Sequence, residues 1–284
     1  MKILLTGASG FIGRHIKQAL ILDEKNNVIT PSHHNANFNN FKASSDWLSL
    51  LKGIDVVINS VGIINETPAQ SFTALHTDAP IALFEACVQS KVKRIIQISA
   101  LGADSQAFTP YQISKHIADD VLRDLPISWF VLRPSLVYGK GGTSLAMFKR
   151  LASLAIIPLP DAGKQQIQPV YIDDLVATVS QCLQTNSKDC HTLDVVGPQP
   201  MSLADYIQAI RHSLDKNKAL ILPIPNNIIL FISHLGKHLF PLMHPDNLRM
   251  LQHGNTADVK PLIDFLGHKP IALADALTHM GKVQ

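Results

Sequence analysis

Cysteine, aromatic residues and charge are all sparse in this chain of 284 residues. The three cysteines, Cys87, Cys182 and Cys190, are odd in number and lack metal-ligand spacing, which excludes a disulfide framework and a structural zinc site. We expect them to be small core residues in a reducing compartment. No apolar run is long enough to span a bilayer, and no signal-peptide pattern precedes the first strand. The sequence therefore predicts a cytoplasmic protein without a transmembrane segment.

Strong charge of either sign is also missing. The net charge is +3 with histidine neutral, and the basic residues are scattered along the chain. Such a balance does not indicate a nucleic-acid partner. Hydrophobic residues make up 46% of the sequence, which at this length predicts a sizeable core and not long disorder.

Strand and helix signals alternate along the first half. Apolar, strand-like segments are expected at 2–5, 28–30, 55–60, 94–99 and 127–133, and helices between them. This rhythm predicts an α/β fold with a doubly wound parallel sheet, whose ligands bind at the carboxyl ends of the strands. We predict a nucleotide-binding core over 1–140. Residues 141–284 are expected to be mixed, partly returning to the sheet and partly forming a smaller lobe.

Three glycines follow the first strand in the segment TGASGFIG at 6–13. A glycine-rich turn that opens a helix leaves backbone N–H groups free at the positive end of the helix dipole, which suits a pyrophosphate. Gly7 would allow the tight turn, Gly10 the close approach of phosphate, and Gly13 the close packing of helix on strand. The alternative interpretation is an ordinary glycine-rich turn.

A second motif, Tyr111-Gln112-Ile113-Ser114-Lys115, falls on a predicted helix over 110–122. Residues four apart share a helix face, so the Tyr111 phenol and the Lys115 ammonium should point the same way. A nearby cation favours the ionised phenol, so we expect Lys115 to lower the pKa of Tyr111 and make it an acid or base near neutral pH. Ser99, at the end of a strand, could hold a substrate carbonyl oxygen beside the phenol. YxxxK also occurs by chance.

Six ordered segments carry a family resemblance: TGASGFIG, INSVG, ISALGAD, YQISK, LRPSLVYG and QPVYIDDL. Together they resemble the short-chain dehydrogenase/reductase superfamily, in its extended and atypical NAD(P)-binding branch of epimerase/dehydratase-like proteins. In detail the chain is similar to the group around the Rossmann-fold accessory subunit of respiratory complex I. The resemblance covers about residues 1–210 and implies a Rossmann core.

The resemblance also implies roles for individual residues. It makes Ser99, Tyr111 and Lys115 the catalytic set, and Asp173 and Asp174 structural residues. The expected cofactor-binding residues, including those argued from the residues themselves, are Gly7, Ser9, Gly10, Phe11, Ile12, Gly13, Arg14, Ser32, His33, Val61, Gly62, Lys115, Pro134 and Val137.

One departure from the usual pattern of NAD-binding proteins bears on the choice of cofactor. An acidic residue usually follows the second strand in NAD binders and accepts the ribose 2′-hydroxyl. Here the segment is Pro31-Ser32-His33-His34, which has no carboxylate to repel a 2′-phosphate. We therefore expect NADP, with NAD as the alternative, and contacts to the phosphate from Arg14, Ser32, His33 and His34. Solvated loop histidines are the alternative interpretation.

Function remains open between two classes at this point. The first is an NADP-dependent oxidoreductase or epimerase-like enzyme with a small-molecule substrate, for which the apolar second half favours a hydrophobic compound. The second is a cofactor-bound, non-catalytic scaffold or assembly factor, because the complex I subunit is itself structural. Residues 225–243 are apolar with interspersed Lys237, His234 and His238, and could pack in the lobe or contact a membrane surface or a protein.

The remaining polar residues are assigned no site. His234 and His238 stand four apart, but no carboxylate accompanies them, so no metal site is predicted. Asp104, Asp119 and Asp120 are expected to be solvated or to cap helices. Cys190 and His191 begin a predicted strand and are expected in the core.

Overall fold

The computed structural model describes residues 1–33, 35–184, 189–225 and 244–282. It divides into two compact units. Unit 1 comprises Met1–Pro134 and Leu175–Asp194, and unit 2 comprises Ser135–Asp174 and Val195–Gln284. The chain therefore leaves unit 1 after Pro134, returns to it for twenty residues and leaves it again. His34 and residues 226–243, where several predictions fall, lie outside the described residues.

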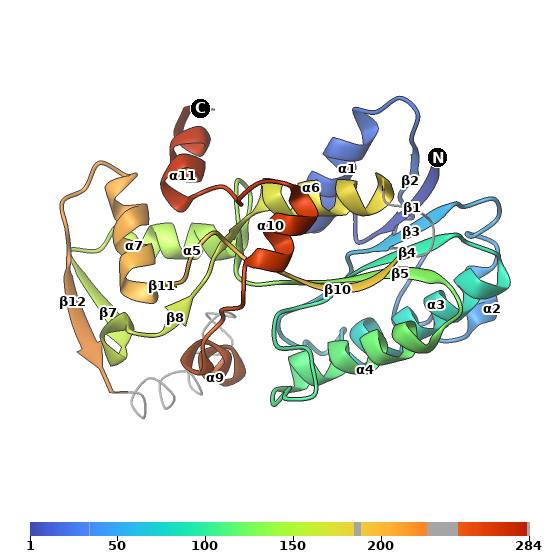
Figure 1. The fold of residues 1–284 in the computed structure, drawn as a ribbon. Helices are drawn as coiled ribbons and strands as arrows, with labels where there is room; N and C mark the ends of the chain where they lie inside the picture. Colours follow the sequence, from blue (N-terminus) through green and yellow to red (C-terminus); the bar gives the residue numbers. More distant parts are fainter. Residues whose placement is uncertain (34, 185–188, 226–243, 283–284) are drawn as a thin grey trace. The chain divides into compact units, whose positions relative to one another are not determined.

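A six-stranded sheet forms the centre of unit 1 (Figure 1). The neighbouring strands β1–β2, β1–β3, β3–β4 and β4–β5 run parallel. The strand order is β10 (Cys190–Val195), β5 (Ser128–Pro134), β4 (Arg94–Ile98), β3 (Val56–Asn59), β1 (Lys2–Thr6) and β2 (Asn27–Ile29). The predicted doubly wound sheet is confirmed. Its order reverses at β1, so the carboxyl ends of β1 and β3 form the switch point where such sheets bind ligands.

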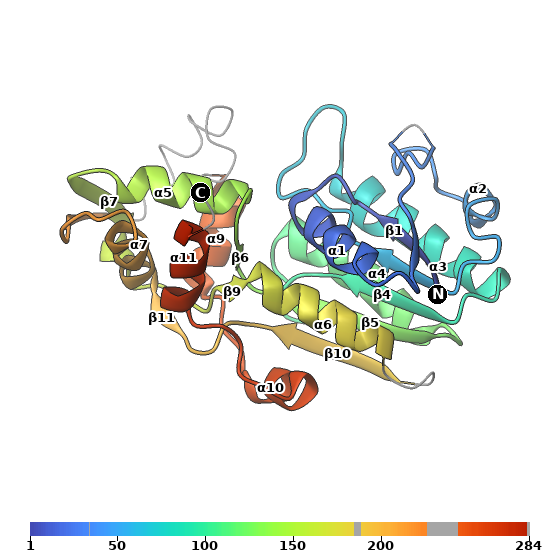
Figure 2. The ribbon, with the colours of Figure 1, turned by 90° about the horizontal axis from the view of Figure 1, so that it is seen from above.

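Helices cover both faces of this sheet (Figures 1 and 2). α1 (Phe11–Ile21) and α6 (Ile172–Gln184) lie on one face, and α3 (Ala79–Gln89) and α4 (Pro110–Asp124) lie on the other. The short α2 (Ser44–Trp47) packs against α3 and buries Trp47 completely. The apolar residues of these strands are buried on both faces, which explains their near-continuous hydrophobic runs.

A π-helix, η1 (Thr73–Asp78), leads directly into α3. The sequence predicted a helix between the strands expected at 55–60 and 94–99, but not its π-helical start. π-Helices are rare and frequently occur at functional sites. This one buries His76, whose surroundings are described below.

Unit 2 is built from short strand pairs and helices. β6 (Val137–Tyr138) pairs with β9 (Val170–Tyr171), β7 (Ile156–Pro160) with β12 (Leu220–Ile224), and β8 (Gln166–Ile167) with β11 (Met201–Ser202). The helices are α5 (Thr143–Ala152), α7 (Leu203–His212), α9 (Pro245–His253), α10 (Lys260–Leu266) and α11 (Leu273–Lys282), with a 3-10 turn η2 (Asp161–Gly163). In the described part of the chain, no helix combines the length and the apolar character needed to cross a bilayer.

Two expectations about the core are corrected. Cys87 and Cys182 are buried as expected, but Cys190 and His191 are exposed. The reason is their position at the start of β10, which is an edge strand with its first three residues exposed.

Asp173 is exposed, whereas Asp174 is buried and its carboxylate accepts the Ile271 N–H at 2.9 Å.

Replacing Gly13 with alanine should destabilise the protein, because α1 packs on the end of β1 through this residue. A Cβ at Gly13 would lie 2.1 Å from the Gly7 carbonyl oxygen. Overpacking of this kind costs about 1–3 kcal/mol of unfolding free energy. Urea denaturation measures the loss. Gly281→Ala is the control, since a Cβ there meets nothing within 4 Å; equal effects of the two changes would contradict the packing argument.

Candidate functional site

The glycine turn between β1 and α1 has the geometry of an anion site. Gly7 has φ +75°, a conformation that favours glycine, and its carbonyl accepts the Gly10 N–H at 2.9 Å. Gly10 is the N-cap of α1 and no acidic residue occupies the first turn of the helix. The first N–H groups of a helix have no intrahelical partner and lie at its positive end. The turn therefore fits the pyrophosphate of a dinucleotide.

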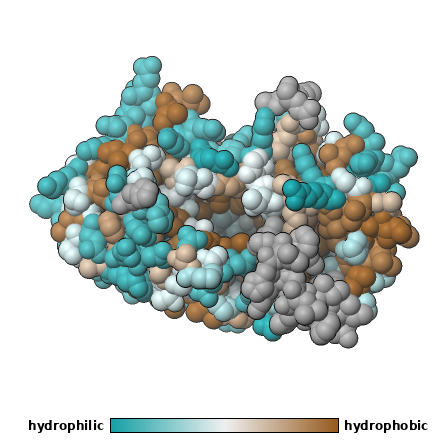
Figure 3. Space-filling view, turned by 180° about the vertical axis from the view of Figure 1, so that it is seen from behind, coloured by the Kyte–Doolittle hydropathy of each residue, from teal (hydrophilic) through white to brown (hydrophobic). Residues whose placement is uncertain are grey.

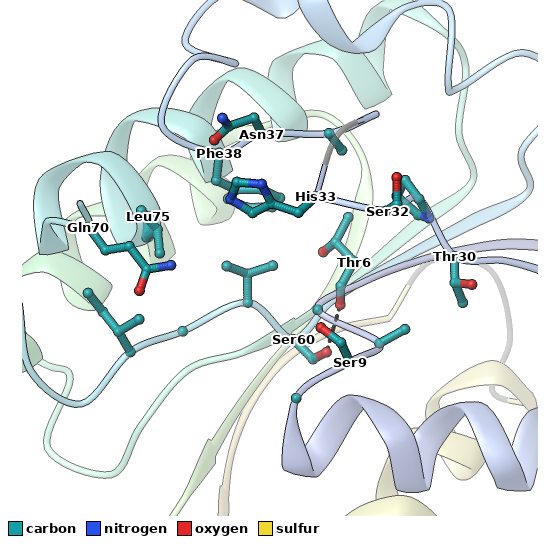
Figure 4. Close-up of a pocket in the computed structure, with 18 of the residues that line it drawn as sticks. Thr6, Ser9, Thr30, Ser32, His33, Asn37, Phe38, Ser60, Gln70 and Leu75 are labelled. Carbon is teal, nitrogen blue, oxygen red and sulfur yellow. Dashed lines mark hydrogen bonds between the residues drawn. The ribbon is translucent and has the colours of Figure 1, made fainter. Parts of the chain in front are cut away.

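A cavity of about 570 Å³ opens at this turn in unit 1 (Figure 4). One side is formed by the glycine turn, and another by residues 30–33 and 36–39, which follow β2. The loop after β3, from Ser60 to Ile63, together with Gln70 and Leu75 completes the lining. The cavity thus lies at the carboxyl ends of β1, β2 and β3, as the doubly wound fold requires.

Half of the predicted cofactor-binding residues line this cavity: Gly7, Ser9, Gly10, Ser32, His33, Val61 and Gly62. Phe11, Ile12, Gly13, Arg14, Lys115 and Pro134 do not line it. Val137 is in unit 2, where it pairs with Val170. Gly13 instead packs against the turn, because the Gly7 carbonyl oxygen occupies the place where a Cβ of residue 13 would lie.

The charge of the cavity bears on the choice of nucleotide. No carboxylate occurs among the described residues that line it, whereas Lys17 of α1 does line it. The sequence analysis missed Lys17, although it follows Gly13 by four residues and so shares its helix face. The cavity therefore presents hydroxyls, amides and one ammonium to a ligand, with nothing anionic to repel a phosphate.

A buried polar network fixes the ends of the central strands beneath the cavity. The Thr6 hydroxyl donates to Asn59 Oδ1 at 2.6 Å, and the Asn59 amide donates to Gln97 Oε1 at 2.8 Å. The Ser60 hydroxyl donates to the Thr6 carbonyl at 2.7 Å, as the dashed line in Figure 4 marks. These bonds join β1, β3 and β4 side by side, so the loops that leave these strands begin from fixed positions.

Tyr111, Lys115 and Asp119 stand one turn apart along α4. Lys115 is buried and its Nζ donates to the Ile98 carbonyl at 3.1 Å. A Cβ at Gly62 would lie 3.5 Å from Lys115 Nζ, so the ammonium reaches the cavity wall. Asp119 is 0% exposed, which corrects the expectation of a solvated or capping residue. The spacing of four from Lys115 was the signal that sequence reasoning overlooked.

The pKa of the Tyr111 phenol moves opposite to expectation. Burial, and then the Asp119 carboxylate, raise it to about 12. Lys115 Nζ lies 6.0 Å from the centre of the Tyr111 ring, too far to outweigh burial. Burial also lowers the pKa of Lys115 to about 8, against the opposing effect of Asp119. The tyrosine is therefore a protonated phenol at neutral pH and can donate a proton.

Ser99 and Asp119 form a buried pair. The Ser99 hydroxyl donates to Asp119 Oδ2. Burial raises the pKa of Asp119 to about 6, although Ser99, Lys115, Arg123 and Arg133 all act to lower it. The other carboxylate oxygen, Oδ1, is buried and has no hydrogen-bond partner among the described residues. Because the single hydrogen of Ser99 is donated to Asp119, it is not available to a substrate oxygen in this arrangement.

His76 of η1 joins the cavity wall to α4, and sequence reasoning missed it. The Ile63 N–H donates to His76 Nε2 at 3.0 Å, and Nδ1 lies 3.0 Å from Ser114 Oγ. Since Nε2 accepts, the proton of the neutral ring is on Nδ1 and is donated to Ser114, which donates in turn to the Tyr111 carbonyl at 2.8 Å. Burial, with Lys115 second, lowers the pKa of His76 to about 2, so the ring stays neutral.

The rings around His76 hold Tyr111 in place. Phe72 stacks on His76 with ring centres 5.3 Å apart, and Tyr111 meets His76 edge-on at 5.5 Å. The Tyr111 side chain is therefore held by neighbouring rings, and the helix that carries it is hydrogen-bonded to η1.

A family model described as "NAD dependent epimerase/dehydratase family" matches residues 3–195, more than half of the chain. The chain belongs to this family. The predicted resemblance to epimerase/dehydratase-like proteins is confirmed.

Relatives of this family member differ in what their names state. A ceramide reductase of Caulobacter vibrioides is 27% identical over 62% of this chain and 58% of its own length. A UDP-glucose 4-epimerase of Vibrio cholerae is 24% identical over 78% of both chains. Subunit 9 of the mouse NADH dehydrogenase 1 alpha subcomplex is 27% identical over 67% of this chain. This chain spans 58% of the length of the reductase and 43% of that of the mouse subunit.

Solved structures support the fold alone. A UDP-glucuronic acid 4-epimerase of Bacillus cereus, in complex with UDP-glucuronic acid and NAD, has a TM-score of 0.73 at 20% identity and covers 99% of this chain and 98% of its own. A UDP-glucose 4-epimerase of Thermotoga maritima with UDP-glucose gives the same score at 18% identity, over 99% and 98%.

Replacing Asp119 with asparagine should remove part of the pH dependence of stability. The pKa of Asp119 rises from 3.8 to about 6 on folding, so the folded state binds more protons than the unfolded state between those pH values. The unfolding free energy of the wild type therefore falls as pH rises through this window and then levels off. Asp119 contributes about 3 kcal/mol or less to this decrease. In the Asp119→Asn variant this decrease of the unfolding free energy should be absent.

Urea denaturation from pH 4 to pH 7 measures this difference. The control is Asp120→Asn, because Asp120 is the exposed neighbour of Asp119 on the same helix. If Asp119→Asn and the wild type lose the same free energy across the window, the buried carboxylate is not ionising as described.

Proposed function

We propose that this family member is an NADP-dependent oxidoreductase or epimerase-like enzyme acting on a carbinol or carbonyl group. The observation that carries the proposal is the convergence at Gly62. This residue lines the nucleotide cavity, and a Cβ there would touch both Lys115 Nζ and His76 Nε2 at 3.5 Å. This proximity supports a single site that combines the Tyr111–Lys115 pair with the nucleotide cavity.

The chemistry divides between cofactor and protein. When bound, the nicotinamide supplies or accepts the hydride. Tyr111 donates its phenolic proton to the oxygen of a carbonyl that is being reduced, and takes it back in the reverse direction. Lys115 places an ammonium near the phenolate that this transfer leaves, and its remaining hydrogens are available for a ribose hydroxyl.

Ser99 enters this scheme through Asp119. With Asp119 ionised, the Ser99 hydrogen is held by the carboxylate. With Asp119 protonated, the carboxylic acid can donate to Ser99 Oγ, and the serine hydrogen becomes free for a substrate oxygen. Asp119 then sets the pH at which Ser99 can serve as a donor.

The preference for NADP rests on the loop after β2. The described lining of the cavity contains Thr30, Ser32 and His33 from this loop and no carboxylate. A carboxylate here would bind a ribose 2′-hydroxyl and repel a 2′-phosphate. Lys17 adds a positive charge to the same cavity, which favours the phosphorylated cofactor.

The names of relatives favour two substrate classes. The reductase relative is named for ceramide, which agrees with a hydrophobic substrate, and the epimerase relative is named for UDP-glucose. A second function, a cofactor-bound scaffold, is supported by the similarity to the mouse NADH dehydrogenase subunit. We favour the enzyme because Tyr111 and Lys115 are both present and stand one turn apart on α4.

Replacing Ser32 with aspartate should invert the cofactor preference. The new carboxylate would face the 2′-phosphate, so we expect NADPH to bind at least about tenfold more weakly, since 1.4 kcal/mol of repulsion suffices for that factor. NADH should bind as well as before or better. Fluorescence titration with both cofactors measures this change, and Ser213→Asp, an exposed serine of unit 2, is the control. An unchanged NADPH affinity would place the 2′-phosphate elsewhere.

Replacing Tyr111 with phenylalanine should separate the enzyme from the scaffold. The change removes the proton donor and leaves the ring contacts with Phe72 and His76, so cofactor affinity should be retained. Reduction of hydrophobic ketones or turnover of UDP-sugars, followed by NADPH consumption or product analysis, should fall about 100-fold or more. Full biological function of the variant in cells would support the scaffold instead.

A further inference from the structure

An exposed aliphatic face lies on the two-stranded β7–β12 ribbon of unit 2. On one side of β7, Ile157 and Leu159 are buried. On the other side Ile156 is 52% exposed, and its register partner Leu220 is 66% exposed. Leu222, opposite Pro158, is 45% exposed, and Leu154 just before β7 is 47% exposed. We call Leu154, Ile156, Leu220 and Leu222 the aliphatic face.

These residues form a patch and not isolated exposures. Figure 3 shows apolar side chains gathered at the right edge of the view, where the β7–β12 ribbon lies after the half-turn from Figure 1. Single exposed apolar residues are ordinary, whereas a contiguous group usually marks an interaction site. In the described part of the chain, no element covers these four side chains.

A basic rim adjoins the aliphatic face. The Arg211 guanidinium donates to the carbonyls of Ala152 and Leu154 at 2.6 and 2.7 Å and to the carbonyl of Asn217. It therefore ties the loop that carries Lys216 and Lys218 to the turn between Arg150 and Leu154. Arg150, Lys216 and Lys218 are all exposed, and Asp215 is the one acidic residue of that loop.

The chemistry of the patch suits lipid better than protein. Pro223 in β12 and Pro158 in β7 interrupt the strand edges, which disfavours addition of a strand from another chain. Protein interfaces are enriched in aromatic residues and depleted in lysine, whereas this patch has leucine, isoleucine and lysine. Aliphatic side chains that enter the acyl region beside lysines at phosphate level are typical of peripheral membrane binding.

We propose that the aliphatic face and its basic rim bind the surface of an anionic lipid bilayer. Leu220, Leu222 and Ile156 enter the boundary between headgroups and acyl chains. Arg150, Lys216 and Lys218 contact lipid phosphates. This attachment is independent of the nucleotide cavity, which is in unit 1.

Co-sedimentation with vesicles tests the proposal on the full chain. The probes are vesicles of phosphatidylcholine alone and of phosphatidylcholine with one-quarter phosphatidylglycerol. We expect binding to the anionic vesicles, weakening as salt is raised, and at least about tenfold weaker binding to the neutral ones. Leu220→Ser with Leu222→Ser should weaken binding about tenfold or more, and so should Arg150→Glu with Lys216→Glu and Lys218→Glu.

The matched control is Ile21→Ser with Leu22→Ser, which removes two apolar side chains that are 54% and 83% exposed in unit 1. This variant should bind like the wild type. All changed positions are exposed, and circular dichroism checks that each variant is folded. Absence of binding to anionic vesicles, or equal loss in the control, would overturn the proposal. A dimer that dissociates on Leu220→Ser with Leu222→Ser, without vesicle binding, would instead assign the face to a second copy of the chain.

Discussion

The contact between Gly13 and the Gly7 carbonyl is the constraint on which the nucleotide site depends. α1 approaches the end of β1 so closely that a single methyl group at Gly13 would overlap the peptide of Gly7. This approach places the N-terminus of α1 at the switch point of the sheet, where Gly10, the N-cap of the helix, lines the cavity. Lys17, one turn further along α1, reaches the same cavity because the helix starts from that fixed position.

The second organising feature is the buried polar line along α4. Tyr111, Lys115 and Asp119 occupy one helix face, and Ser99 at the end of β4 meets the last of them. Burial outweighs the attraction between Lys115 and Asp119 in setting the pKa values of these two groups, whereas the Asp119 carboxylate adds to the effect of burial on the pKa of Tyr111. His76 connects this line to the cavity wall by hydrogen bonds with Ile63 and Ser114.

Much of the fold could be predicted from the sequence because its signals are local. Apolar runs bounded by glycine, proline and asparagine predicted the central strands, and the glycine turn and YxxxK motif were visible in single short segments. His76 could not be found that way, since its role comes from contacts between η1 and α4, 38 residues apart in sequence. The raised pKa of Tyr111 was unpredictable for the same reason: spacing gives the lysine as a neighbour but does not give the depth of burial. Asp119 was predictable in principle from its spacing to Lys115, whereas the exposure of Cys190 depends on the order of strands in the sheet.

The central claim is that the glycine turn holds a dinucleotide whose 2′-position carries phosphate. Its most direct test is the melting temperature of the wild-type protein with NADPH, with NADH or with neither. A ligand at about a hundred times its dissociation constant adds roughly 2.7 kcal/mol, and for a chain of this size each kcal/mol moves the midpoint by about 2–4 °C. We predict a rise of several degrees with NADPH and a smaller rise with NADH. No rise with either cofactor would contradict the account, because the turn would then hold no nucleotide.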